Sequence, residues 1–324
     1  MISDKFVFDF NNLEMRGFID RPENMETKVL IVIIPGDGKT DIQNDPYYKK
    51  LRMVFTENGY ACCLWDKIGC GKSKGKYYQI PIDYSANEAV AAINEIKKDN
   101  RYLFENIGLW GISRAGWICP IIISKIPSIA FWISVSGTNE IENFPYMLKS
   151  NFEIEGKKPD LANELVDEWI KGTKAFLEGA SALTYLSLTR KLREDNYYRK
   201  HFGPTNGIFV LLGYRKLQSK YRSTLHYFDP ETEIEIYLPN MKELLDMNCS
   251  VLAIFGEKDT VIDWKKTKEL YEGTIGNKLS VVTFKNGNHG LRESVNGSIT
   301  EHCEIECNGY YGCMISWLKS LNLD

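Results

Sequence analysis

The chain has 324 residues, a length that allows one large domain or a core domain with a second module. Hydrophobic residues make up 44% of it and charged residues 26%, which is the usage of a folded globular protein and excludes a disordered or collagen-like chain. The formal net charge is −3 with acidic and basic residues interspersed, so we expect no nucleic-acid partner and no binding to an anionic membrane surface.

The N-terminal segment lacks the pattern of a targeting or membrane-spanning sequence. Residues 1–10 alternate polar and apolar side chains, which is typical of a strand and not of a signal peptide. The longest apolar run near the start covers residues 29–35, far short of the roughly 20 residues that cross a bilayer. We therefore expect a cytoplasmic protein whose eight cysteines stay reduced.

Short apolar runs alternate with helical patterns through the first 136 residues, as in a mostly parallel sheet with crossover helices. The first two runs predict a hairpin around Asn11-Asn12, and the continuous apolar runs after them predict strands buried on both faces. The predicted strands are Lys5–Phe10, Leu13–Ile19, Lys28–Ile34, Tyr60–Trp65, Ile107–Trp110 and Phe131–Val135. Before the predicted strand Ile107–Trp110, the segment from Ser85 to Glu88 has the spacing of a capping box, which predicts the start of a helix.

The pattern changes between residues 137 and 248, where long charged and aromatic-rich helical stretches replace the alternation. Asp160–Glu178 and Ala182–Lys200 are two of these stretches. Strand and helix patterns then resume in Ser250–Phe255, Trp264–Tyr271, Ser280–Phe284 and Gly309–Leu321. We predict an α/β fold with a mostly parallel, doubly wound sheet built from residues 1–136 and 249–324, and a helical cap inserted over residues 137–248.

A serine follows directly on the predicted strand Ile107–Trp110, in the sequence G-I-S-R-A-G of residues 111–116, and an apolar helix comes next. A sharp turn between strand and helix presents a serine hydroxyl above the sheet edge, and small residues around it let the backbones approach closely. Ser113 is therefore a candidate nucleophile, with a buried structural turn as the alternative.

A serine hydroxyl needs a base within hydrogen-bonding distance and a third group that orients the base. Of the four histidines, His201 and His226 lie in the predicted cap and His302 precedes the last helix. His289 lies in N-G-N-H-G directly after a predicted strand, where glycines let the backbone bring the ring over the sheet edge. We expect His289 to be the base; a solvent-facing loop histidine is the alternative.

The orienting acid is expected in the loop after the strand Ser250–Phe255, because the carboxyl ends of parallel strands meet at one edge of a sheet. Asp259 is the candidate in this loop. Glu257 and Asp263 are rivals, although Asp263 is more simply explained as the N-cap of the helix that begins at Trp264. The chain order is then serine, aspartate, histidine, as expected on a doubly wound sheet of this kind.

Together these motifs resemble those of the α/β-hydrolase superfamily over essentially the whole chain outside the predicted cap. Residues 66–73 read D-K-I-G-C-G-K-S, which is similar to the D-x-x-G-x-G-x-S turn of those enzymes. The sequence around Ser113, G-L-W-G-I-S at residues 108–113 followed by G-W-I at 116–118, is most similar to that of bacterial dienelactone-hydrolase-related esterases with a helical cap. The resemblance implies the α/β-hydrolase fold and a serine hydrolase.

Two backbone N–H groups are expected to form an oxyanion hole. One belongs to Arg114, directly after the nucleophile, and the other to Asp37, in the P-G-D-G loop after the strand Lys28–Ile34. Asp37 holds the position similar to the family's donor. The loop departs from the family's motif because Pro35 stands in place of the usual histidine, and because an aspartate side chain opposes an oxyanion unless it is turned away.

Two other patterns have simpler explanations. The G-K-S of residues 71–73 ends like a phosphate-binding loop, but the first glycine of that motif would stand at Asp66, and Pro81 comes too soon for the helix that should follow. A late group of metal-capable side chains lacks a second paired set at zinc-site spacing. This group consists of His302, Cys303, Cys307 and Cys313.

We predict a serine hydrolase that forms an acyl ester on Ser113 and needs no metal or organic cofactor. The aromatic-rich cap favours a small-molecule substrate that is a bulky hydrophobic ester or lactone, for example a macrocyclic lactone such as a macrolide. Packing between the cap helices is the other explanation of these aromatic residues. They are Tyr185, Tyr197, Tyr198, Phe202, Phe209, Tyr214, Tyr221, Tyr227 and Phe228.

Two alternative functions stay open. An aminopeptidase of the same superfamily would bind a free amine through a cap carboxylate, with Glu164, Asp167 and Glu168 as candidates. A catalytically silent binding module would reuse the fold without an activated serine. Amino-acid arylamides and a fluorophosphonate label would separate these from an esterase.

Overall fold

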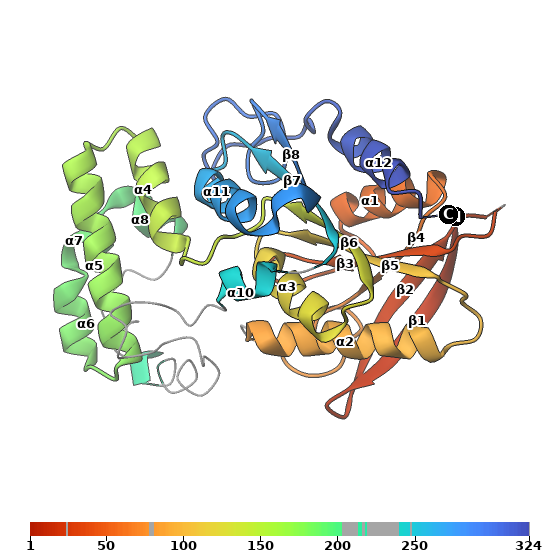
Figure 1. Cartoon of the computed structure of the whole chain (residues 1–324). Coiled ribbons are helices and arrows are strands. Elements are labelled where there is room, and N and C mark those ends of the chain that lie inside the picture. The colour runs from red at the N-terminus through yellow and green to blue at the C-terminus, as the bar shows by residue number, and fades with distance from the viewer. Residues whose placement is uncertain are drawn as a thin grey trace.

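An eight-stranded sheet forms the centre of the computed structural model, which describes residues 1–23, 25–77, 81–202, 213–215, 218, 240–246 and 248–323. The strands are β1 (Ile2–Phe10), β2 (Leu13–Arg21), β3 (Val29–Ile34), β4 (Ala61–Trp65), β5 (Asn106–Ile112), β6 (Ile129–Val135), β7 (Ser250–Gly256) and β8 (Leu279–Phe284). Their order across the sheet is β1-β2-β4-β3-β5-β6-β7-β8 (Figure 1).

Pairing directions place the carboxyl ends of six strands at one edge. β1 and β2 form an antiparallel hairpin around Asn11 and Asn12, whose φ angles of +53° and +61° suit a two-residue hairpin turn. β2 also pairs antiparallel with β4, whereas the pairs from β4 through β8 are parallel. Loops that follow β3, β4, β5, β6, β7 and β8 therefore emerge at the same edge, where ligands of open α/β sheets bind.

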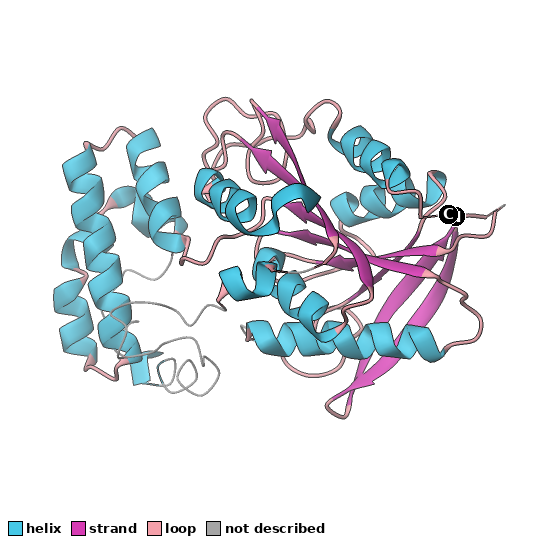
Figure 2. Cartoon of the chain, in the orientation of Figure 1, coloured by secondary structure: helices cyan, strands magenta, loops and turns pink. Residues whose placement is uncertain are grey.

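Helices cover both faces of the sheet (Figure 2). The described helices of the core are α1 (Pro46–Glu57), α2 (Ile82–Lys98), α3 (Ala115–Lys125), α10 (Met241–Leu245), α11 (Trp264–Ile275), η1 (Gly276–Lys278) and α12 (Tyr310–Ser320). α1 and α12 share one apolar cluster, and α2, α3, α10 and α11 share the other. In β3, Leu30 packs into one cluster and Ile31 into the other, so a continuous apolar run is buried on both sides. The predicted doubly wound, mostly parallel sheet is confirmed.

The predicted capping box at the start of α2 is wrong. α2 begins at Ile82 with Pro81 as its N-cap, and the Ser85 N–H already donates to the Pro81 carbonyl. The proline ring suits the start of a helix, since its fixed φ is compatible with the first turn and it brings no N–H that needs a partner. Glu88 lies in the core instead, where its carboxylate accepts a hydrogen bond from Trp65 Nε1 at 2.6 Å.

A separate group of helices lies between β6 and β7, beside the core layers in Figure 1. Its members are α4 (Phe144–Ile154), α5 (Pro159–Leu177), α6 (Ala182–Leu188), α7 (Arg190–Glu194) and α8 (Asn196–His201). We call residues 144–202 the helical unit. It has an apolar cluster of its own, which includes Leu148, Phe152, Leu165 and Leu192. At the other end of the predicted insertion, α10 packs with α3 and α11.

The stretch 182–200 is not one helix, as its pattern suggests, but three. Asp195 has an extended backbone (ψ 128°) and its side chain accepts from the Tyr198 N–H, so it ends α7 and caps α8. Asp caps helices well because its oxygen pairs with an otherwise unpaired N–H. No helix in the described part of the chain is both long enough and apolar enough to cross a bilayer.

Candidate active site

The turn between β5 and α3 holds Ser113 in a left-handed backbone conformation. Its φ of +57° is uncommon for a residue with a side chain. The Ser113 N–H donates to the Val135 carbonyl at 2.9 Å, and its carbonyl accepts from the Gly116 N–H at 2.8 Å. A Cβ atom at Gly116 would lie 2.5 Å from the Thr138 nitrogen, and one at Gly111 would lie 2.8 Å from side-chain atoms of α3. Small residues are therefore required on both sides of the serine.

Three side chains that are far apart in the sequence meet at the edge of the sheet. His289 Nε2 lies 2.9 Å from Ser113 Oγ, and His289 Nδ1 lies 2.7 Å from Asp259 Oδ2. The Asp259 side chain is fully buried, whereas 23% of the His289 side chain is exposed. An imidazole held in this way can accept the serine proton at Nε2 while Nδ1 keeps its own proton against the carboxylate.

The loops after β7 and β8 support one another through close backbone contact. Lys258 N–H donates to the Gly287 carbonyl at 2.9 Å, and a Cβ atom at Gly256 would lie 2.3 Å from that same oxygen. Asp259 Oδ1 accepts from the backbone N–H groups of Val261 and Ile262, at 2.8 and 3.0 Å. The carboxylate is thus oriented by its own loop, and that loop is fastened to the one that carries His289.

The helical unit also contacts the loop between β7 and α11, residues 257–263, which contains Asp259 and which we call the acid loop. Tyr146 on α4 donates its hydroxyl to the Asp259 carbonyl at 3.2 Å. Asn151 on the same helix donates to Thr260 Oγ1 at 3.2 Å and accepts from the Ile299 N–H at 3.0 Å. These contacts tie α4 to the segment that positions the acid, a connection that sequence reasoning did not identify because it depends on tertiary packing.

The rival residues have other partners. Asp263 caps α11 by accepting from the Lys266 N–H, as predicted, and Glu257 accepts from the Thr283 hydroxyl at the surface. The His201 ring contacts Tyr197 inside the helical unit. His302 is exposed and pairs with Glu304. His226 lies outside the described residues.

The loop after β3 lies against the serine. A Cβ atom at Gly36 would be 3.3 Å from Ser113 Cβ and 3.2 Å from the Ile112 carbonyl oxygen, so this glycine permits the approach. The Asp37 side chain is 60% exposed, and its Oδ1 lies 3.7 Å from Arg114 Nη1. The carboxylate therefore faces solvent and a guanidinium, which reduces its conflict with a negative charge near the Asp37 backbone.

The turn at residues 66–73 holds neighbouring loops together. Asp66 accepts from the N–H groups of Ile42 and Lys72, and a Cβ atom at Gly71 would fall 2.0 Å from the Asp66 carboxylate. The Ser73 hydroxyl donates to the Asp66 carbonyl at 2.6 Å and accepts from the Arg16 N–H at 2.9 Å. The Lys72 N–H and the Ser73 hydroxyl thus stabilise the turn, and the described residues that follow it directly, 74–77, form no helix.

Lys67 in this turn is a residue whose importance sequence reasoning missed. Its Nζ donates to the carbonyl oxygens of Gly36 and Gly38 in the loop after β3. Burial lowers its pKa to about 8, and the Arg114 charge acts in the same direction. Its place beside Asp66 in the D-x-x-G-x-G-x-S turn was the available signal, since loops that follow adjacent strands meet at one edge.

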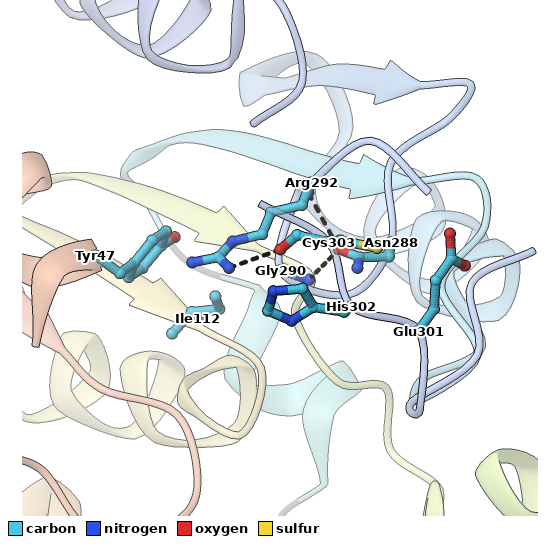
Figure 3. A pocket seen from close by; sticks show the side chains of 8 residues that line it. All are labelled: Tyr47, Ile112, Asn288, Gly290, Arg292, Glu301, His302 and Cys303. Carbon is cyan, nitrogen blue, oxygen red and sulfur yellow. Dashed lines mark hydrogen bonds between the residues drawn. The ribbon is translucent and has the colours of Figure 1, made fainter. Parts of the chain in front are cut away.

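A cavity of about 360 Å³ borders the neighbours of Ser113 and His289 (Figure 3). It is lined by Tyr47, Ile112, Asn288, Gly290, Arg292, Glu301, His302 and Cys303. The Arg292 side chain extends toward Tyr47, and its Nη1 donates to the Cys303 carbonyl at 2.8 Å. Asn288 Oδ1 accepts from the N–H groups of Gly290 and Arg292, which closes the turn around His289.

Several residues of the predicted cap have packing roles. Tyr197 is buried in the apolar cluster of the helical unit, and Tyr214 is buried against Tyr185 and Phe176. Tyr198 stacks on Phe202. Phe209, Tyr221, Tyr227 and Phe228 lie outside the described residues.

The three carboxylates considered for an amine site differ in their partners and in their exposure to solvent. Glu164 pairs with Lys191, Glu168 accepts from the Leu192 N–H at 2.9 Å, and Asp167 is exposed. Among the described residues, no group of three or more His, Cys, Asp or Glu side chains is arranged to hold a metal ion. The late cysteines are free thiols, with Cys303 and Cys307 buried.

No protein-family model and no curated protein matches this chain, but many solved structures resemble it. Esterase Pf2001 from Pyrococcus furiosus is 12% identical, with 99% of this chain and 89% of that chain covered and a TM-score of 0.56. Est1E from Butyrivibrio proteoclasticus, solved with ferulic acid bound, is 15% identical, with 98% of each chain covered and a TM-score of 0.55. Proline iminopeptidase from Mycobacterium smegmatis is 14% identical, with 99% of each chain covered and a TM-score of 0.58. The chain has the α/β-hydrolase fold.

Proposed function

We propose that this chain is a serine hydrolase that cleaves carboxylic esters through an acyl-enzyme. The observation that carries the proposal is the continuous hydrogen-bonded series from Ser113 Oγ through His289 to a buried Asp259. A serine alcohol becomes a nucleophile when a base removes its proton during attack, and a third group fixes the tautomer of that base. The fold and the esterase structures that share it support the same activity.

In the first half-reaction, Ser113 Oγ attacks the acyl carbon while His289 Nε2 takes the hydroxyl proton. The resulting imidazolium is stabilised by the Asp259 carboxylate, and the N–H groups of Asp37 and Arg114 bind the developing oxyanion. The tetrahedral intermediate collapses as His289 returns the proton to the leaving alcohol. The products of this step are the free alcohol and an acyl ester on Ser113.

In the second half-reaction, water replaces the alcohol. His289 removes a proton from the water while the water oxygen attacks the acyl carbon. His289 then protonates Ser113 Oγ as the carboxylic acid leaves. The N-terminal end of α3 begins directly after Arg114. Its backbone dipole favours negative charge at this end in both tetrahedral intermediates.

We infer that the substrate is a bulky hydrophobic ester or lactone, for example a macrocyclic lactone such as a macrolide. We also infer that the chain is related to the dienelactone-hydrolase-related esterases with a helical cap. The contacts of α4 with the acid loop support a substrate site next to the helical unit. The cavity of about 360 Å³ is lined by Ile112, Asn288 and Gly290, the sequence neighbours of Ser113 and His289, and its volume is at the small end of ligand pockets. A panel of esters graded by acyl size, with lactones of small and large ring, tests this inference.

Glu142 favours a peptidase as a second candidate. It follows β6 and is half-buried, and burial raises its pKa, the backbone N–H groups of Phe144 and Asn143 lower it, and the charge of Asp37 raises it slightly. Its Oε1 accepts from the Phe144 N–H at 2.8 Å. A carboxylate so placed would bind the free amine of an amino-acid arylamide, and hydrolysis of arylamides faster than of matched esters would favour this activity.

Fluorophosphonate labelling tests the proposed function, because the reagent reacts with activated serines. We expect one adduct, on Ser113, together with hydrolysis of an aryl ester. Ser113→Ala should abolish both, whereas Ser124→Ala on α3 should keep both because that hydroxyl only donates to the Ile121 carbonyl. A folded wild-type chain without an adduct would instead favour the catalytically silent binding module.

A further inference from the structure

Lys67 joins the turn after β4 to the loop that contains Asp37. Its Nζ donates to the carbonyl oxygen of Gly36 and, at 2.9 Å, to that of Gly38. Its backbone N–H donates to Thr40 Oγ1 at 3.0 Å. One residue therefore holds this loop at three points, on both sides of Asp37.

The hydrogen bond to Gly36 sets the direction of the Asp37 N–H. In a planar trans peptide, the carbonyl and the following N–H point to opposite sides. With the Gly36 oxygen directed at Lys67, the Asp37 N–H points away from Lys67. Because Gly36 approaches Ser113 closely, with a hypothetical Cβ 3.3 Å from Ser113 Cβ, this amide lies beside the nucleophile.

The charge on Lys67 also strengthens this amide as a donor. An ammonium bound to a carbonyl oxygen polarises the peptide and makes its N–H more positive, and the effect is larger in a partly buried site than in water. Burial and, to a smaller extent, the Arg114 charge lower the pKa of Lys67, whereas Asp37, Cys70 and Glu88 raise it, and the net pKa is about 8. The charge is thus lost as the pH rises through a range in which activity can be assayed.

We propose that Lys67 is a positioning residue of the oxyanion hole, which turns and polarises the Gly36–Asp37 peptide so that the Asp37 N–H binds the developing oxyanion. The inference rests on the proposed function. Lys67 exchanges no proton or bond with the substrate, so its effect falls on the rate of acylation and deacylation and not on binding of the ground state.

The test compares Lys67→Met, which removes the donor, with Lys67→Arg, which keeps a charge over the whole assay range. Lys72→Met is the matched control, since Lys72 belongs to the same turn and is exposed. The measurements are kcat and KM for an aryl ester from about pH 6 to pH 10, the rate of inactivation by a fluorophosphonate, and the thermal unfolding temperature.

For the wild type we expect kcat to fall as the pH rises through about 8, because the active form carries the charged Lys67. Lys67→Met should lower kcat by about 10- to 100-fold at neutral pH, somewhat less than loss of a direct oxyanion donor, with KM changed by less than about threefold. Lys67→Arg should restore most of the activity and remove the fall near pH 8. A merely structural lysine would not move this part of the pH profile.

Equal kcat and inactivation rates in Lys67→Met and Lys72→Met would overturn the proposal, as would a fall near pH 8 that persists in Lys67→Arg. If Lys67→Met does not fold, the pH profile of Lys67→Arg decides alone, because loss of the fall supports the proposal and its persistence refutes it. The proposed function is judged separately by labelling of the wild type at Ser113. A wild type that labels normally while Lys67→Met matches its control refutes only the role of Lys67.

Discussion

Asp259→Asn is the sharpest test of the proposed chemistry, because both oxygens of this carboxylate have assigned partners. Oδ1 accepts from the Val261 and Ile262 N–H groups, and Oδ2 accepts from His289 Nδ1. In the asparagine variant, the single carbonyl oxygen is needed by the two backbone donors, so the NH₂ group faces the imidazole. His289 then accepts at Nδ1 and carries its proton on Nε2, which points at Ser113 Oγ and blocks its action as a base.

The expected loss follows from this reversed tautomer. A base held in the wrong tautomer costs about 10⁴-fold in kcat, which corresponds to about 5.5 kcal/mol at 1.36 kcal/mol per factor of ten. The assay is steady-state hydrolysis of an aryl ester, with thermal unfolding to confirm that the variant folds. Folding should be retained, because the asparagine oxygen still satisfies the two buried N–H groups that the aspartate satisfied.

Asp263→Asn is the matched control. Asp263 lies four residues along the same segment and caps α11 through the Lys266 N–H, a role that asparagine fills equally well. We expect this variant to retain wild-type activity and stability. A folded Asp259→Asn protein with activity within about tenfold of the wild type would refute the assignment of Asp259 as the group that orients His289.

Two further predictions concern the elements around the site. Gly116→Ala should lower the free energy of unfolding by about 1–3 kcal/mol, because the new Cβ would lie 2.5 Å from the Thr138 nitrogen. The control is Gly312→Ala on α12, where a Cβ meets nothing within 4 Å, and this variant should keep the stability of the wild type. Equal denaturant midpoints of the two variants would contradict this prediction. Burial raises the pKa of Glu88 to about 7, so between the unfolded pKa near 4.5 and about 7 the folded state binds more protons and stability should fall as the pH rises. Glu88→Gln should remove this dependence of the unfolding temperature, and parallel pH profiles for the two proteins would refute it.

The sheet and the serine turn were predictable because local constraints determine them. A strand buried on both faces needs apolar side chains at every position, as in β3, and this leaves a continuous run in the sequence. The turn at Ser113 requires small residues at 111 and 116, since larger ones would collide with α3 and with the segment after β6. Such steric requirements restrict the residue type at each position, so a pattern of residue types is sufficient to predict them.

Other features were not predictable, because they depend on contacts between distant segments. The starts and breaks of helices were misjudged where one residue outweighed a pattern: Pro81 is the N-cap of α2, four residues before the expected cap, and Asp195 divides a continuous helical pattern. The role proposed for Lys67 depends on two carbonyl groups of another loop; the turn that contains Lys67 places it near that loop but does not specify which groups its side chain reaches. Sequence patterns record which side chains a local backbone tolerates, but not which backbone groups a long side chain will reach.

The geometry of the site also shows why these distant contacts are needed. The left-handed backbone of Ser113 is expected to cost about 1–3 kcal/mol, so surrounding contacts must hold it. Its N–H is bonded to Val135 on the neighbouring strand, and Gly36 closes against its side chain. Lys67 in turn holds the Gly36 loop, so the proposed oxyanion donor and the proposed nucleophile, Ser113, are fixed by the same set of contacts. Loosening the loop should therefore impair the placement of donor and nucleophile together, and a variant that affects one should not leave the other unchanged.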